Sequence, residues 1–255
     1  MLTVNIIGSG NVAHHLIQEI LTHPSVILQK VYARNPANLT VEGLEQSIIC
    51  NDIQELKTAD ITIISVTDQA IEDVSSMLPF SGQLVVHTSG TTHLDALNNK
   101  NRRGVFYPLQ TFSKHKKVDF KKIPICLETE NKTDLHTLQE FGKILSDEVH
   151  FINSAQRKAL HVAAVFVNNF TNHLNSIAED ICEQNQIPSK ILQPLLQETT
   201  DKLQTLSPLE AQTGPAVRHD QQTIAAHSAF IKDNLTREIY QKLTLSIQKH
   251  HGRKL

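Results

Sequence analysis

The sequence predicts an α/β protein whose doubly wound, mostly parallel sheet is followed by an all-helical C-terminal domain. Three observations predict this fold class. In the first half of the 255-residue chain, short and nearly continuous apolar runs alternate with helical or turn-rich segments, as they do in parallel strands that are covered on both faces. A glycine turn, GSGNVA, separates the first run from the first helical segment. After residue 152, apolar residues recur at steps of three and four, which is the period of a helix.

The predicted strands are the apolar runs of the first domain. They span Leu2–Gly8, Ile27–Asn35, Ser47–Asn51, Ala59–Thr67, Gly82–Gly90, Arg103–Leu109, Lys122–Glu128 and Glu148–Ile152. The first helix, NVAHHLIQEILTH, follows the first strand after the glycine turn. We place the boundary near Phe151, which gives an α/β domain at residues 1–151 and a helical domain at residues 152–255.

The second domain begins where Asn153 or Ser154 is expected to cap a helix that runs to about Gln186. Its segment HVAAVFVNNF looks buried, because Ala163, Ala164, Val165, Phe166 and Val167 follow one another without a polar residue between them. A further helix starts at Pro188 and continues through Leu203. Prolines and a glycine then interrupt the pattern at Ser207–Asp220, and we expect a last helix from Gln221 to the end of the chain.

Composition excludes several classes of partner. The chain is 40% hydrophobic and 20% charged with a net charge of −2, so no overall positive field would attract nucleic acid or an anionic membrane. No segment approaches the roughly 18 apolar residues that span a bilayer. The three cysteines are far apart, and the first residues show no charged region followed by an apolar stretch. From this we expect a cytoplasmic protein with reduced thiols. No tight His/Cys cluster has zinc spacing, so no metal is expected.

The glycine turn predicts a dinucleotide site. Gly8 permits a tight turn, Gly10 lets the backbone approach a pyrophosphate, and Ala13 allows close packing of helix on strand. The helix that follows presents free N–H groups to phosphate. The alternative is a glycine turn that binds no ligand. The position of the turn within a βαβ series favours the dinucleotide site. The predicted phosphate-binding residues are Gly8, Ser9, Gly10, Asn11 and Val12.

The end of the second predicted strand favours NADP over NAD. An NAD enzyme usually carries an acid there, whereas this chain has Arg34 and Asn35. The guanidinium suits a 2′-phosphate, although a solvated arginine is the alternative. Because ligands lie beyond the carboxyl ends of parallel strands, we expect the nicotinamide and its ribose near Val66, Thr67 and Asp68.

The fifth predicted strand ends in HTSG, where Ser89 or His87 is a candidate to hydrogen-bond a substrate. The alternative is that the polar side chains at these strand ends cap neighbouring helices. For Thr88 and Asp68 this alternative is nearly as strong.

With VYARN, HTSG, YPLQTFSK, HVAAVFVNNF and QTGPAVRHD in this order, the whole chain resembles a family of bacterial proteins. These combine an N-terminal Rossmann-like domain with a C-terminal DUF2520 helical domain and are described as NADP oxidoreductases. They are similar in architecture to pyrroline-5-carboxylate reductases, ketopantoate reductases and β-hydroxyacid dehydrogenases. One feature departs from the last group, whose catalytic lysine stands one helical turn before an asparagine. Here Ala164 and Val165 occupy those positions, which argues against a plain hydroxyacid dehydrogenase.

The histidine and asparagines of HVAAVFVNNF are the main catalytic candidates. On a regular helix His161, Val165, Asn168 and Asn172 lie along one stripe, and the resemblance implies that this stripe borders the cleft between the domains. We expect His161 to be the acid–base group, with Asn168 and Asn169 positioning the substrate. The alternative is that these side chains hydrogen-bond across helices in a buried dimer core.

The turn at Gly214-Pro215 could present Arg218 to a substrate carboxylate, or Arg218 could pair with Asp220. The sequence thus predicts an NADP-dependent oxidoreductase that acts on a small anionic carbonyl or imine compound and dimerises through its helical domain. Two alternatives stay open: a nucleotide-binding sensor or scaffold without turnover, and a reductase that uses a deazaflavin. The predicted catalytic residues are His161, Asn168, Asn169, Ser89 and Arg218.

Overall fold

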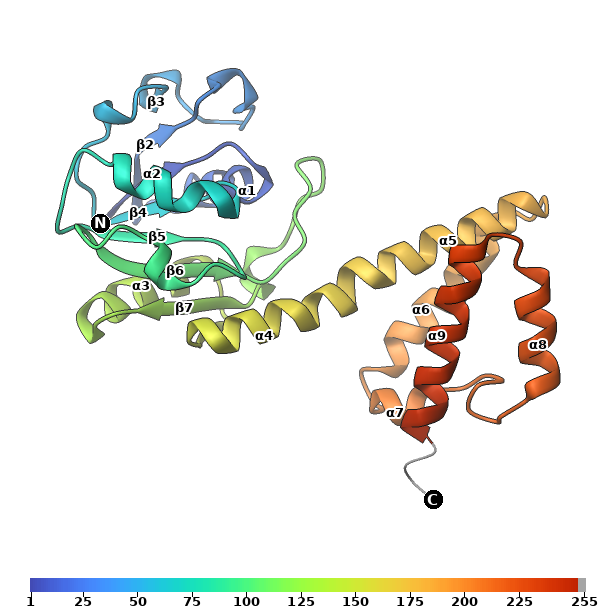
Figure 1. Cartoon of the computed structure of the whole chain (residues 1–255). Coiled ribbons are helices and arrows are strands. Elements are labelled where there is room, and N and C mark those ends of the chain that lie inside the picture. Colours follow the sequence, from blue (N-terminus) through green and yellow to red (C-terminus); the bar gives the residue numbers. More distant parts are fainter. Residues whose placement is uncertain (252–255) are drawn as a thin grey trace. The chain divides into compact units, whose positions relative to one another are not determined.

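The chain forms two compact units (Figure 1). The computed structural model describes residues 1–251. Unit 1 is Met1–Asn168 and unit 2 begins at Asn169. The last strand ends at Phe151, close to the boundary that the sequence predicts, but the helix that follows it also belongs to unit 1.

Unit 1 is built on one eight-stranded sheet with the order β3-β2-β1-β4-β5-β6-β7-β8. The strands are β1 Leu2–Ile7, β2 Val26–Tyr32, β3 Ile49–Cys50, β4 Ile61–Ile64, β5 Leu84–His87, β6 Arg102–Pro108, β7 Ile125–Thr129 and β8 Val149–Phe151. Neighbouring strands are parallel except β6 and β7. The predicted strands are therefore all present, mostly in shorter form, and the chain reverses direction across the sheet between β1 and β4.

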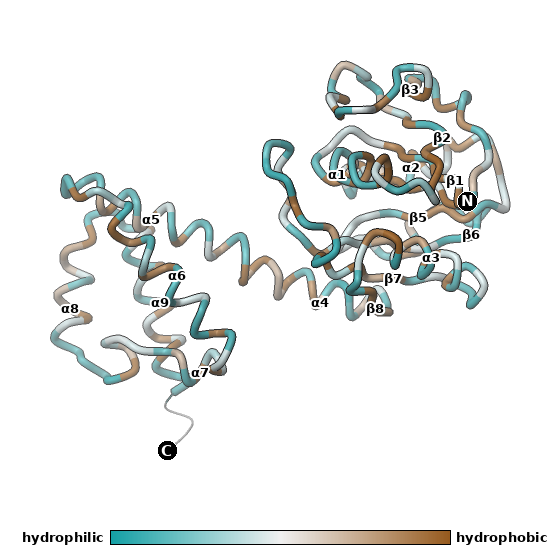
Figure 2. The backbone as a smooth tube through the Cα atoms, turned by 180° about the vertical axis from the view of Figure 1, so that it is seen from behind, coloured by the Kyte–Doolittle hydropathy of each residue, from teal (hydrophilic) through white to brown (hydrophobic). Residues whose placement is uncertain are grey.

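Helices cover both faces of this sheet, which confirms the doubly wound fold class. One buried cluster joins β1 to α1 (Asn11–Ile20) and α3 (Lys132–Leu145). A second cluster joins the other face to α2 (Ile71–Met77). Figure 2 shows the hydrophobic stretches of unit 1 gathered along the strands and α1. The connections after β2 and β5 hold only single turns of 3-10 helix instead of full helices.

The helix after the sheet begins as the sequence predicts. Asn153 caps α4 (Ser154–Ala164) by accepting a hydrogen bond from the N–H of Gln156, whose side chain in turn accepts from the N–H of Asn153. This capping box satisfies two of the amides that a helix start leaves free.

The segment after α4 differs from the predicted regular helix. Val165–Phe170 is a π-helix, and α5 (Thr171–Gln184) follows. Because a π-turn closes on the fifth residue instead of the fourth, the predicted stripe from His161 to Asn172 does not keep its spacing across this segment. The segment is also exposed in the single chain, contrary to expectation, with Phe166 64% and Val167 77% exposed.

Unit 2 is helical, but its last predicted helix is interrupted. Its elements after α5 are α6 Gln193–Lys202, α7 Pro208–Ala211, α8 Gln221–Phe230 and α9 Asn234–His251. The prediction of one helix from Gln221 onward is therefore wrong. Asp233 accepts a hydrogen bond of 2.7 Å from the N–H of Thr236 at the start of α9. Arg237 donates to the carbonyl groups of Ser228 and Ile231, near the end of α8. Both ends of the break are thus stabilised.

Unit 2 buries few apolar side chains of its own. Among its described residues, Cys182 and Ala216 are the buried hydrophobic ones. Many large apolar side chains are exposed instead: Leu174, Ile187, Ile191, Leu195, Leu196, Leu203, Leu206, Phe230, Leu235, Leu243 and Leu245. Exposed apolar residues in this number are typical of a surface that another protein covers.

Candidate cofactor and catalytic site

A cleft of about 1090 Å³ opens at the carboxyl ends of the central strands of unit 1, which is large enough for a nucleotide-sized ligand. Its lining includes every residue that the sequence predicts to bind the cofactor: Gly8, Ser9, Gly10, Asn11, Val12, Arg34, Asn35, Val66, Thr67 and Asp68. Of the predicted catalytic residues, Ser89 and His161 line it. The cleft lies where the strand order reverses, the usual ligand site of such sheets.

Gly8 is required by the packing of β1 against the end of β4. Its φ is +133°, a conformation that residues with a side chain rarely adopt. A Cβ atom there would lie 2.0 Å from the carbonyl oxygen of Ser65. Glycine at this position therefore lets the turn close directly over the neighbouring strand.

The N-terminus of α1 is open toward an anion. Gly10 is the N-cap, no side chain caps the helix, and the first turn contains no acidic residue. A Cβ atom on Gly10 would meet nothing within 4 Å, so the space above this turn is free. The first amides of a helix lack partners within the helix and carry partial positive charge. The turn thus fits a dinucleotide pyrophosphate.

Arg34 stands at the end of β2 as a free cation. Its side chain is exposed and makes no hydrogen bond or ion pair with any residue that the structure describes. Asn35 is partly engaged, because its Oδ1 accepts a hydrogen bond of 3.2 Å from the N–H of Ala37. Nearby, Lys114 Nζ donates to the carbonyl oxygen of Asn38 at 3.2 Å, and Asn38 also lines the cleft. This end of the site is therefore cationic.

Ser89 is held inside its own turn. Its Oγ accepts hydrogen bonds from the N–H groups of Thr91 and Thr92, at 3.1 and 2.9 Å, and donates to Thr92 Oγ1 at 2.9 Å. Asp68 accepts a hydrogen bond from Thr91 Oγ1. These bonds hold the turn itself and cap no neighbouring helix among the described residues, and a contact of Ser89 with substrate stays a prediction.

His87, the other candidate in HTSG, is fully buried and does not line the cleft. Its Nδ1 accepts a hydrogen bond of 3.1 Å from the N–H of Ser89. Its Nε2 is buried and has no hydrogen-bond partner among the described residues. Burial first, and then the positive charge of Arg157, lower the pKa of His87 to about 4. It is therefore neutral at physiological pH and shapes the HTSG turn from inside.

A tyrosine–histidine pair lies in the cleft and was not predicted. Tyr107 Oη is 3.1 Å from Nδ1 of His161, and both residues line the cleft. A Cβ atom on Gly90 would lie 2.4 Å from His161 Nδ1 and 2.9 Å from the Tyr107 ring. Burial raises the pKa of Tyr107 to about 12, so its hydroxyl keeps its proton at neutral pH. Tyr107 precedes the carboxyl end of β6 by one residue, the one signal in the sequence that could have indicated it.

A buried ion pair fixes the helix that carries His161. Arg157 is 1% exposed and its guanidinium contacts Glu128 Oε2. Arg157 also donates to the carbonyl oxygen of Thr92 at 2.6 Å and to Ser154 Oγ at 3.1 Å. Glu128 Oε1 accepts from the N–H of Ser154 at the start of α4. Because His161 follows Arg157 by four residues, the two side chains share one face of α4.

The remaining predicted residues are not in the cleft lining. Asn168 is an exposed residue of the π-helix, whereas Asn169 and Arg218 belong to unit 2. Asp220 caps α8 by accepting from the N–H of Thr223 at 3.0 Å; no ion pair joins it to Arg218 among the described residues. The catalytic roles of these residues therefore stay predictions.

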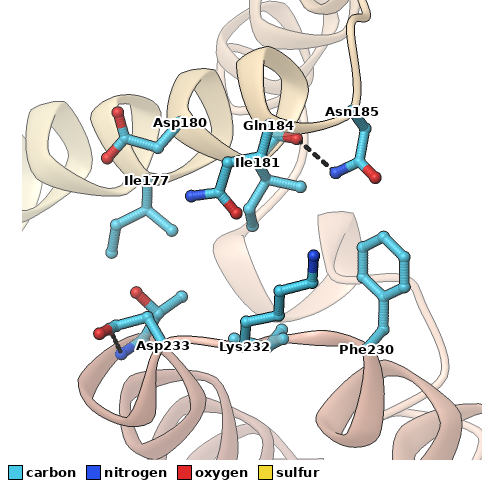
Figure 3. A pocket seen from close by; sticks show the side chains of 10 residues that line it. Ile177, Asp180, Ile181, Gln184, Asn185, Phe230, Lys232 and Asp233 are labelled. Carbon is cyan, nitrogen blue, oxygen red and sulfur yellow. Dashed lines mark hydrogen bonds between the residues drawn. The ribbon is translucent and has the colours of Figure 1, made fainter.

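Unit 2 has a pocket of its own, of about 310 Å³, between α5 and the segment that joins α8 to α9 (Figure 3). Asp180, Lys232 and Asp233 are its charged residues. None of the predicted site residues lines it. Within residues 1–251 no group of three or more His, Cys, Asp or Glu side chains could hold a metal ion, and no described helix is long and apolar enough to cross a membrane.

Comparisons with known proteins agree with this architecture. The family model described as "Domain of unknown function (DUF2520)" matches residues 123–247. A Bacteroides fragilis protein provisionally described as an NADP oxidoreductase is 31% identical in sequence. Its crystal structure superposes over 97% of this chain and 98% of its own, with a TM-score of 0.83.

Two more distant structures share the fold. One is a Thermotoga maritima protein that is 18% identical in sequence. It superposes over 98% of this chain and 99% of its own, with a TM-score of 0.76. The other is the pyrroline carboxylate reductase of Plasmodium falciparum with NADP bound, which is 11% identical. It superposes over 97% of this chain and 98% of its own, with a TM-score of 0.63. None of the curated proteins that were compared matches the chain significantly.

Proposed function

The chain belongs to the DUF2520 family of Rossmann-like proteins, and we propose that it is an NADP-dependent oxidoreductase. One observation carries this proposal: the open phosphate turn and the pair of Tyr107 and His161 line the same cleft. When bound, NADPH would supply a hydride to the substrate. The α1 N-terminus would bind the pyrophosphate, Arg34 the 2′-phosphate, and His161 would take part in proton transfer.

The cofactor assignment is supported by residues and relatives alike. Arg34 is exposed, unpaired among the described residues, and at the strand end that faces the adenosine ribose in this fold. The Bacteroides protein is described as an NADP oxidoreductase, and the Plasmodium structure contains NADP.

We further propose a small anionic carbonyl or imine compound as the substrate. A reductase of a cyclic imine, pyrroline carboxylate, has the same fold. We keep Ser89, Asn168 and Asn169 as candidates to position the substrate, and Arg218 as a candidate to bind a carboxylate.

Arg34→Asp is expected to weaken NADPH binding at least tenfold, which corresponds to about 1.4 kcal/mol, while NADH binding stays unchanged or improves. The reason is that the substitution removes the cation for the 2′-phosphate and adds a repelling charge. Isothermal titration calorimetry with both nucleotides measures the effect. Lys143→Asp, on the exposed surface of α3, makes the same charge reversal outside the cleft lining and should bind NADPH normally. Equal NADPH affinity in Arg34→Asp and the parent protein would contradict the assignment.

Turnover is tested separately with a panel of 2-keto acids and cyclic imino acids. Oxidation of NADPH, followed by the absorbance of the reduced nicotinamide, is expected with at least one compound. NADPH binding without oxidation by any member of the panel would instead identify a nucleotide-binding sensor.

We also propose that the protein is a homodimer. The support is the exposed apolar surface of unit 2, where Leu195 is 65% and Phe230 60% exposed, because an unaccompanied unit would leave these side chains in water. Light scattering coupled to size-exclusion chromatography is expected to give twice the mass of the chain at micromolar concentration. A monomeric mass across the accessible concentration range would refute the dimer.

A further inference from the structure

We propose that Tyr107 is the catalytic acid of this site, and that His161 restores the proton that Tyr107 gives to the substrate. The inference rests on the proposed function, because it names the proton donor of the same reduction. Tyr107 thereby takes the proton-donating role that we predicted for His161 from the sequence.

The first support is the placement of the two side chains. Tyr107 comes from β6 and His161 from α4, 54 residues later, and their Oη and Nδ1 atoms are 3.1 Å apart. Gly90 leaves the room for this contact, since any Cβ there would overlap both rings. The pair thus depends on three separate segments that meet at one wall of the cleft.

The second support is chemical. Tyr107 is only 9% exposed, and burial raises its pKa to about 12, so it carries a proton to donate at any physiological pH. A phenolate left alone in such a place would be costly. His161 removes this cost, because its protonated ring can return a proton across the existing hydrogen bond. The ring is half-buried and can recover its own proton from solvent.

The substrate carbon accepts a hydride from bound NADPH, which leaves NADP⁺. The π electron pair of the C=O or C=N bond moves onto oxygen or nitrogen, and this atom takes the proton of Tyr107 Oη. Tyr107 then takes the proton from Nδ1 of the His161 imidazolium. The substrate gains one hydride and one proton in total.

The surroundings hold the pair in place. On the histidine side, the Arg157–Glu128 ion pair anchors α4 one helical turn before His161. On the tyrosine side, the backbone of Tyr107 pairs with Cys126 in β7. Proton transfer along a preset hydrogen bond needs such fixed geometry.

Tyr107→Phe tests the donor directly, because it removes one oxygen and keeps the ring. We expect kcat for reduction of the responsive panel compound to fall by about 100-fold or more, while the NADPH affinity measured by calorimetry stays the same. Tyr240→Phe is a matched control, because it too removes a tyrosine hydroxyl that lies close to a histidine: Tyr240 Oη is 3.0 Å from Nδ1 of His227 in unit 2.

His161→Ala tests the relay. Its kcat is expected to fall as well, and added imidazole should restore part of it, which a purely structural role would not allow. Imidazole should not restore Tyr107→Phe. Failure of imidazole to raise the kcat of His161→Ala would overturn the relay.

The hydrogen bond between Tyr107 and His161 can be tested by NMR without any substrate. Nitrogen NMR of histidine-labelled protein should show Nδ1 of His161 as a hydrogen-bonded atom, and Tyr107→Phe should shift this resonance more than any other histidine signal. An unchanged His161 resonance would overturn the pair.

The outcomes separate this inference from the function on which it rests. If the parent protein reduces a panel compound and Tyr107→Phe keeps more than about a third of its kcat, the general acid does not contribute its usual factor and only the inference fails. If the parent protein binds no NADPH or reduces nothing, the proposed function fails first and the inference with it.

Discussion

Arg157→Met is expected to lower the free energy of unfolding by about 3–5 kcal/mol, the usual cost of leaving one charge of a buried ion pair alone. Arg157 is 1% exposed, and its guanidinium bridges Glu128, Ser154 and the carbonyl oxygen of Thr92. Methionine fills similar space but supplies none of these donors. Chemical denaturation monitored by circular dichroism measures the change.

The partly exposed pair of Arg103 and Glu130 provides the control for that measurement, because the side chains of Arg103 and Glu130 are 18% and 37% exposed. Arg103 contacts Glu130 through two nitrogens. Arg103→Met should therefore cost about 1 kcal/mol or less. The double variant Glu128→Leu/Arg157→Met should recover part of the loss, because no buried charge is then left unpaired. Equal losses for Arg157→Met and Arg103→Met would show that burial does not set the strength of the first pair.

The protein is expected to lose about 3 kcal/mol of stability through His87 as the pH falls from 6.5 toward about 4. The pKa of His87 is lowered from 6.5 to about 4 in the folded state, by burial first and by Arg157 second. Between these values the unfolded chain binds a proton that the folded chain does not. This contribution is therefore complete above pH 6.5 and is lost as the pH approaches 4.

His87→Asn removes the titrating ring and keeps an acceptor for the N–H of Ser89. Its free energy of unfolding should depend less on pH between 6.5 and 4.5, where most carboxylates are still ionised. His136→Asn, at an exposed ring on α3, should retain the slope of the parent protein. Denaturant titrations at several pH values compare the three proteins, and a slope in His87→Asn as steep as that of the parent would refute the role of His87.

The parts of the site that the sequence predicted are those that depend on local chemistry. Gly8 and Gly10 stand between a strand and a helix whose patterns are unambiguous, so their turn and its open amides follow from neighbours in the sequence. Arg34 is likewise fixed by its place at the end of β2. The strand runs were found because parallel strands are apolar on both faces.

The parts that were missed depend on contacts across the chain. Tyr107 meets His161 only because β6 and α4 are brought together by the sheet and by the Arg157–Glu128 pair. The π-helix at Val165–Phe170 has a sequence that also fits a regular helix, so spacing alone could not reveal the widened turns. Apolar composition likewise could not distinguish a core segment from one that stays exposed in a single chain.

The absence of a side chain on Gly90 is what lets the phenol of Tyr107 and the imidazole of His161 form their hydrogen bond, since even a methyl group would overlap both rings. A search of related sequences can therefore look for three residues together: glycine after the serine of HTSG, tyrosine at the position of Tyr107 and histidine at that of His161. Chains that keep all three should form the same hydrogen-bonded pair, and chains with a bulkier residue in place of the glycine should have lost it.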